Sequence, residues 1–208
     1  MNFSLYQVDK PKKLKRLSSN KMSFFKNNDD DINLFHFNEI ETGMFHIVYN
    51  IEDVYQVGTK RVGNQMNLPF RQFINCFFFI DNEYFLLEET IDQYREDLVK
   101  HVETKAGVAI KLKTLNNNDF VKLFSYLNGF IKRLEYVDEN EVDYFLNSVS
   151  GKEFNEIAEN YTLDRVTLLV EDQFVSIYRK GKISVDNSDE EYLIKFTKEI
   201  ANAIHNNN

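Results

Sequence analysis

The sequence predicts an α+β protein with a mainly antiparallel sheet, several hairpins and about four amphipathic helices. Two-residue turns join apolar, alternating segments, and such turns make antiparallel neighbours. Four other segments carry apolar residues at helical spacing behind a capping pattern. The 208 residues include only 7 Gly and 2 Pro, so no flexible linker divides the chain. We therefore expect one compact unit or two abutting lobes.

Residues 1–70 are expected to form a strand-rich N-terminal part without a convincing helix. The predicted strands are residues 3–8, 21–26, 32–37, 44–51 and 54–60. Between the first two strands, the segment from Pro11 to Arg16 indicates a basic turn, since four of its six residues are Lys or Arg.

Residues 71–138 are expected to form a hairpin-helix-strand-helix unit. Residues 73–80 are apolar on both alternations, which is typical of a central strand covered on both faces. The Asp81-Asn82 pair supplies a turn into a partner strand at 84–88.

Two helices follow in this unit. Thr90 and Gln93 form a capping-box pattern for a helix that Gly107 ends, and a strand follows at 108–114. Asn118 is the predicted cap of the second helix, whose apolar residues repeat at three and four as far as Leu134.

Residues 139–208 are expected to hold a helix, a three-strand meander and a C-terminal helix. Ser150 and Ser188, each followed three residues later by Glu, are the predicted helix caps. The meander strands lie near 165–171, 173–179 and 182–186. Segments 107–131 and 181–204 share a glycine, a strand, a cap and a helix, which raises the possibility of two loosely repeated lobes, although such units also recur by chance.

Cysteine use and hydropathy indicate a cytoplasmic protein. The single cysteine, Cys76, lies in an apolar run and is expected to be buried rather than bonded to another cysteine. No apolar run reaches the roughly 18 residues that a membrane span needs, and the N-terminus lacks a signal-peptide core. We expect no membrane association.

The formal charge of -8 is unevenly distributed along the chain. Residues 1–26 hold seven basic residues and one acidic residue, a local charge of +6 that leaves -14 for the rest. Opposed charge blocks can steer a partner, although ordinary solvated faces give the same pattern. The candidate basic residues for binding nucleic acid or a partner are Lys10, Lys12, Lys13, Lys15 and Arg16. The candidate acidic residues for binding a partner are Glu135, Asp138, Glu139, Glu141 and Asp143.

Catalytic signatures are weak. The glycines lack the spacing of a phosphate-binding loop, and one Cys with four scattered His residues gives no metal-ligand pattern, so we predict no metal and no cofactor. Arg95 and His101 lie near one another on a predicted helix, and such a pair could polarise a phosphodiester and move protons. The same spacing arises readily on a solvated helix face.

These observations favour a non-catalytic protein-interaction or assembly subunit over an enzyme. Aromatic residues make up 14% of the chain, which is enough to leave some at an interface with a protein partner or a second copy. The composition also suggests a bacterial or phage source, such as a defence or mobile-element complex. The alternative is a nucleic-acid-binding or phosphodiester-cleaving protein.

Overall fold

A computed structural model describes residues 1–22, 31–58, 61, 63 and 65–205. Its helices and strands follow one another in this order: β1 (Asn2–Val8), the 3-10 helix η1 (Pro11–Met22), β2 (Ile32–Glu41), β3 (Met44–Gly58), β4 (Gln65–Phe79), β5 (Tyr84–Glu88), α1 (Asp92–Ala106), β6 (Ile110–Leu112), α2 (Asn117–Leu127), β7 (Phe130–Val137), β8 (Asp143–Val149), α3 (Gly151–Asn160), β9 (Thr162–Val170), β10 (Gln173–Tyr178), β11 (Lys182–Val185) and α4 (Glu190–His205). The α+β class is confirmed.

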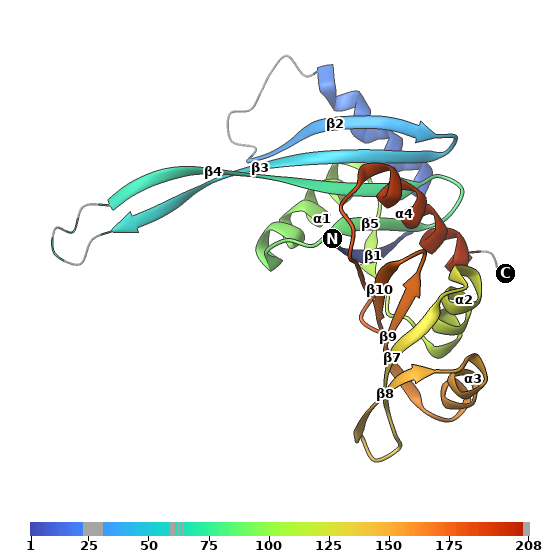
Figure 1. The fold of residues 1–208 in the computed structure, drawn as a ribbon. Helices are drawn as coiled ribbons and strands as arrows, with labels where there is room; N and C mark the ends of the chain where they lie inside the picture. Colours follow the sequence, from blue (N-terminus) through green and yellow to red (C-terminus); the bar gives the residue numbers. More distant parts are fainter. Residues whose placement is uncertain (23–30, 59–60, 62, 64, 206–208) are drawn as a thin grey trace.

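One antiparallel sheet of eleven strands runs through the described part of the chain. Its order is β2-β3-β4-β5-β1-β11-β10-β9-β7-β8, and β6 pairs with β1 beside β11. Segments 1–70, 71–138 and 139–208 all contribute strands to this sheet. The sheet is strongly twisted, and its two edge strands, β2 and β8, lie far apart (Figure 1).

Each face of the sheet has its own hydrophobic core, because successive residues of a strand point to opposite sides. On β5, Tyr84 and Leu86 belong to one core, while Phe85 and Leu87 belong to the other. Helices α2, α3 and α4 cover the first core. Helices α1 and η1 cover the second (Figure 1). We call these two sides the α4 face and the α1 face.

A glycine holds β11 and β6 end to end beside β1. Gly181 has φ +78°, and its carbonyl accepts a hydrogen bond from Leu5 N at 2.8 Å. A Cβ atom at this position would lie 2.1 Å from the carbonyl oxygen of Lys113. The backbone therefore requires glycine here for both its angle and its space.

The predicted N-terminal turn is wrong, because η1 occupies residues 11–22. Leu14 and Leu17 are both buried against the α1 face. A three-residue spacing places side chains on one side of a 3-10 helix, and Pro11 suits its first position. The predicted strand at 21–26 begins in η1, and residues 23–30 lie outside the described residues.

The helix predicted to reach Leu134 is also wrong, since α2 ends at Leu127. Asn128 adopts φ +48° and donates its N–H to the Phe124 carbonyl at 3.0 Å, which closes the helix. Strand β7 follows. Its pairing with β9 shifts register between Ile131 and Arg133, which buries Ile131 and Leu134 at a three-residue spacing. This irregularity imitates the helical repeat.

Three of the four predicted caps differ from the structure. The Asn116 side chain, rather than that of Asn118, accepts from Asp119 N at 3.0 Å. Thr90 instead donates to Gln72, and Asp189 accepts from Tyr192 N in place of Ser188. The Ser150 cap and the Gly107 end of α1 are confirmed. The meander and the pairing of 84–88 with β4 are confirmed as well.

Candidate interaction surface: the β3–β4 arm and the pocket at its base

The longest hairpin of the sheet extends well beyond its neighbouring strands. Strands β3 and β4 pair without a register shift from Met44↔Phe79 to Gly58↔Gln65. Strand β2 follows β3 only as far as Ile51, and β5 pairs with β4 only at residues 76–78. Residues 52–58 and 65–71 project from the body as a two-stranded ribbon, which we call the arm (Figure 1).

The two faces of the arm differ sharply in polarity. Ile51 belongs to the core of the α1 face, so every second residue beyond it continues that face. The cross-strand register adds their partners on β4. Beyond Asp53, which lies opposite Phe70 at the base, this face is apolar and consists of Tyr55, Val57, Met66, Leu68 and Phe70. The opposite face carries Glu52, Val54, Gln56, Asn67, Pro69 and Arg71. The first four apolar-face side chains are 43 to 62% exposed.

Both edges of the arm resist the addition of another strand. Asn75 directs its N–H away from β3, toward Glu88, and the alternation of the ladder directs the Pro69 nitrogen the same way. Pro69 thus removes a donor from the outer edge of β4. On the β3 edge, the Asp53 carboxylate accepts the N–H of Val54 at 2.7 Å. Since strand addition needs free edge groups, the faces of the arm are better suited to contact.

An aromatic chain fixes the arm to the body. The Tyr94 ring of α1 stacks on Phe70 with the ring centroids 6.4 Å apart, and Phe70 meets Tyr55 edge-on at 4.9 Å. On the other face, Arg71 and Glu52 form an ion pair at 3.2 Å. These contacts hold the base of the arm, while the described residues farther out pair only with the facing strand of the hairpin.

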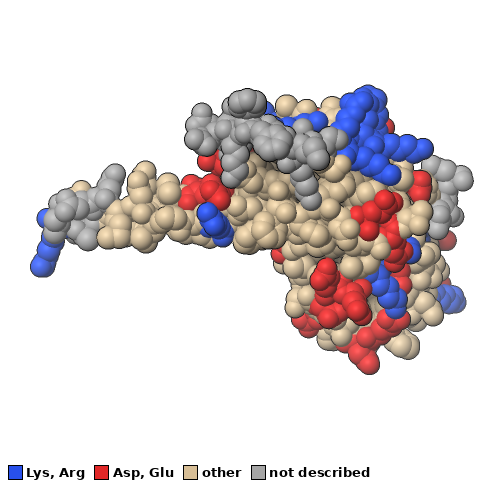
Figure 2. All heavy atoms as spheres, turned by 90° about the horizontal axis from the view of Figure 1, so that it is seen from above, with Lys and Arg blue, Asp and Glu red and all other residues tan. Residues whose placement is uncertain are grey.

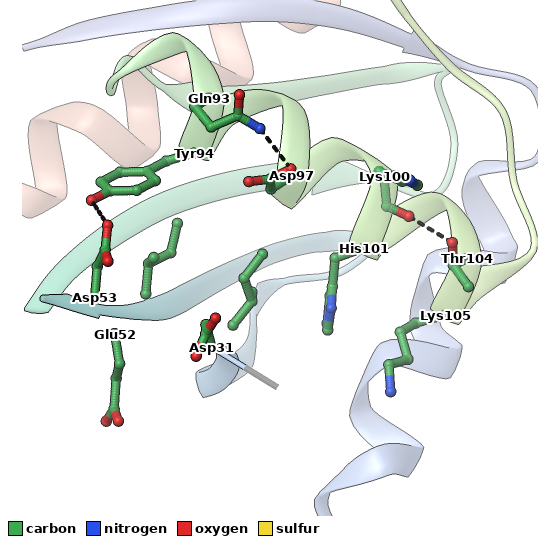
Figure 3. Close-up of a pocket in the computed structure, with 12 residues that line it drawn as sticks. Asp31, Glu52, Asp53, Gln93, Tyr94, Asp97, Lys100, His101, Thr104 and Lys105 are labelled. Carbon is green, nitrogen blue, oxygen red and sulfur yellow. Dashed lines mark hydrogen bonds between the residues drawn. The ribbon is translucent and has the colours of Figure 1, made fainter. Parts of the chain in front are cut away.

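A pocket of about 600 Å³ lies at the base of the arm, between α1 and strands β2 and β3. Its charges are separated (Figure 3). Asp53 and Asp97 lie toward the end where β3 and β4 leave the body, and Lys105 lies toward the opposite end. Asp31 and Glu52 also line the pocket. The hydrogen bonds to Asp53 and Asp97 come from neutral groups, so the arm end of the pocket is negatively charged.

A hydrogen bond between Tyr94 and Asp53 shifts the pKa of both groups. The Tyr94 hydroxyl donates to the Asp53 carboxylate, which lowers the pKa of Asp53, and the Val54 N–H lowers it further. The same bond raises the pKa of Tyr94 to about 12. The carboxylate is therefore held ionised at the point where the arm begins.

The two candidate catalytic residues, Arg95 and His101, line different pockets. Arg95 pairs with Glu89 and Asp92 and lines a second pocket beside Tyr6. His101 lines the pocket at the base of the arm and meets Tyr49 edge-on, with the ring centroids 5.8 Å apart. His101 follows Arg95 by six residues, which at about 100° per residue points the two side chains about 120° apart around the helix, so the structure does not bring them to one site.

The predicted basic residues lie on or beside η1. Lys12, Lys15 and Arg16 are exposed on that helix, Lys13 reaches the Gly107 carbonyl, and Lys10 pairs with Asp9. Figure 2 shows Lys and Arg side chains gathered over this part of the molecule. The basic residues farther along the chain lie on both faces of the sheet. Lys105 is on α1, which covers the α1 face, and Lys122 is on α2, which covers the α4 face.

The predicted acidic residues lie near the opposite edge of the sheet. Glu135 on β7 pairs with Arg133 and Arg165. Asp138 closes the turn into β8, where the N–H of Val142 lowers its pKa. Glu139 and Glu141 are exposed in that turn, and Asp143 begins β8. The structure therefore separates the basic and acidic candidates.

Three features of the described residues concern metal binding, membrane crossing and the cysteine thiol. Within residues 1–22, 31–58, 61, 63 and 65–205, no group of three or more His, Cys, Asp or Glu could hold a metal ion. No helix in that part of the chain is long and apolar enough to cross a bilayer. Cys76 is buried as expected, and burial raises its pKa well above the usual value, so the thiol stays protonated.

The arm was not predicted from the sequence. Residues 44–51 and 54–60 are predicted as separate strands, although β3 is continuous, and residues 65–72 are assigned to none. The signal lies in two matched alternations, Tyr55-Gln56-Val57 and Met66-Asn67-Leu68, on either side of a segment containing Gly63.

No known family model matches this chain, and no curated protein has a significantly similar sequence.

Proposed function

We propose that the protein is a non-catalytic interaction or assembly subunit that binds a protein partner through the apolar face of its arm. One observation carries this proposal: beyond Asp53, the described residues on the α1 side of the arm are all apolar, and only the Tyr94 ring over Phe70 covers part of that face within the described structure. Large exposed apolar patches mark interaction sites. Two residues of the arm's strands, Pro69 and Asp53, also discourage pairing through the edges.

The outer part of the arm makes few contacts with the body of the protein. From Tyr55 to Gly58 and from Gln65 to Leu68, the described residues of β3 and β4 pair with each other and with no other described strand. A two-stranded ribbon alone is marginally stable in water. Retaining four exposed apolar side chains on such a ribbon is costly for solubility unless a partner covers them.

A photo-crosslinking experiment in the cells that naturally make the protein tests this function. A benzophenone amino acid is placed at Val57 on the apolar face or at Gln56, its neighbour on the polar face. We expect a discrete crosslinked protein from position 57, identified by mass spectrometry, and little or none from position 56. Equal crosslinking at both positions, or none at position 57, would contradict the proposal.

Binding of nucleic acid through η1 is the second candidate, because three exposed basic residues share this helix and could neutralise phosphates. A mobility shift measured over a salt series tests it. Loss of binding in the triple variant of Lys12, Lys15 and Arg16 to Gln supports it, whereas no shift at about 50 mM salt rejects it. For either function we propose a reducing cytoplasm as the setting, in keeping with the protonated, buried Cys76.

A further inference from the structure

Opposite charges lie at the two ends of the apolar face of the arm. At the base, Asp53 and Asp97 make the pocket acidic on its arm side. At the tip, Arg61 is exposed in the turn between β3 and β4. Between these ends, the described arm residues 54–58 and 66–70 include no charged side chain. Figure 2 shows this uncharged stretch between the charged groups at the base and the basic side chain at the tip.

We propose that the partner is a second copy of this chain, whose arm packs antiparallel against this one so that each Arg61 enters the acidic pocket of the other copy. The proposal rests on the function proposed above and names its partner. A two-fold axis makes both contacts at once, because the same patch then serves on both subunits.

Charge decides the orientation of the two arms. In a parallel arrangement, the two Arg61 side chains would meet at one end and the two acidic pockets at the other. In the antiparallel arrangement, each arginine instead faces carboxylates, which is favourable for the pair and rejects the wrong register. The pocket and the apolar face both lie on the α1 side of the sheet, so one partner arm can contact both.

The spacing along the arm fits this arrangement. Placing the two-fold axis at the level of Gln56 sets the Tyr55–Leu68 row of one copy over the Val57–Met66 row of the other. Arg61 lies five residues beyond this level, and Ile51, which lines the pocket, lies five residues before it. At about 3.3 Å per residue of strand, Ile51 is roughly 16 Å from the axis, and Gly58, the last residue of β3, is roughly 7 Å from it on the other side, three residues before Arg61.

The area of the arm sets the expected strength of the dimer. Seven residues per strand give a ribbon about 23 Å long and two strands wide. That surface is well short of the roughly 800 Å² per partner of a standard stable interface. The two insertions of Arg61 add to it, so we expect a concentration-dependent dimer whose affinity depends on salt.

Sedimentation velocity over a concentration series tests this arrangement through charge reversal. Arg61→Glu and Asp97→Arg should each weaken dimerisation about tenfold, because each places like charges together. The double variant R61E/D97R should recover wild-type association to within about threefold. Glu96→Arg is the matched control, since Glu96 is on the same helix but lines the other pocket. R61E/E96R should remain as weak as R61E.

The sedimentation series and the crosslinking experiment test different partners of the arm. A wild-type chain that stays monomeric throughout the series overturns the second copy as partner. In that case a crosslink from position 57 to a different protein would still support the interaction function. The antiparallel arrangement is overturned if neither charge reversal weakens the dimer, or if the double variant does not recover the affinity of the wild type.

Discussion

The hydroxyl of Tyr94 on α1 donates a hydrogen bond to the carboxylate of Asp53, at the point where β3 leaves the body of the protein. The bond joins the helix that covers the sheet to the strand that continues without cover. It also keeps Asp53 ionised beside the pocket. One contact therefore supports both the direction of the arm and the charge at its base.

Tyr94→Phe should raise the pKa of Asp53 toward its ordinary value, because the variant loses the strongest hydrogen bond to the carboxylate. A carboxyl whose pKa is lowered by folding stabilises the protein above its unfolded pKa of about 3.9, and this contribution is lost as the pH falls through the lower folded value. A pH titration of the Asp53 carboxyl carbon by NMR measures the shift.

The contribution of Tyr94 to stability depends on pH in the opposite direction. Its pKa is raised to about 12, so its contribution to stability is present below about pH 10 and is lost as the pH rises through the folded value. Tyr144→Phe serves as a control, since Tyr144 donates to Asp138 at the other end of the sheet. An Asp53 titration unchanged in Tyr94→Phe would show that the hydrogen bond does not form.

Gly181→Ala should destabilise the protein by more than about 3 kcal/mol, since the new Cβ would need both a strained backbone angle and the space of the Lys113 carbonyl. Gly63→Ala provides the comparison. Gly63 has φ +65°, but no atom of the described residues lies within 4 Å of the position of a Cβ, so the expected cost is only about 1 kcal/mol. Urea unfolding measures both, and equal losses would contradict the role assigned to Gly181.

Three successive asparagines should give three different results. Asn116→Ala should cost about 1 kcal/mol, because it removes the cap of α2. Asn117→Ala should cost roughly 2 to 3 kcal/mol, since its amide bonds Ala158 O, Tyr161 O, Leu163 N and Arg179. Asn118→Ala should stay within about 0.5 kcal/mol. Thermal unfolding gives the ranking, and a larger loss at Asn118 than at Asn116 would restore the cap predicted from the sequence.

Much of the fold could be predicted because local signals and tertiary structure agree. The Glu171-Asp172 turn has both residues at positive φ, and the meander around it lies where the sequence places it. Prediction failed where local signals misled: η1 buries two leucines beneath a basic surface, and the register shift in β7 gives a strand the spacing of a helix.

The candidate site was harder to predict than the fold. Strands β3 and β4 extend beyond their neighbours because β2 and β5 end earlier. The alternation of residues within one hairpin does not show where the neighbouring strands end. Arg95 and His101 are close in sequence, yet a helix directs their side chains into different pockets. The acidic pocket joins residues of α1 and β3, so only the folded chain shows it.

The most direct test of the central claim compares the sedimentation of Val57→Lys with that of Gln56→Lys. The two variants add the same charge to adjacent, exposed positions of one strand, on its apolar and polar faces respectively. With both variants shown to be folded by circular dichroism, we predict that Val57→Lys weakens dimerisation at least about tenfold, while Gln56→Lys stays within about threefold of the wild type. Equal effects of the two variants, or no effect of Val57→Lys on a wild-type dimer, would contradict it.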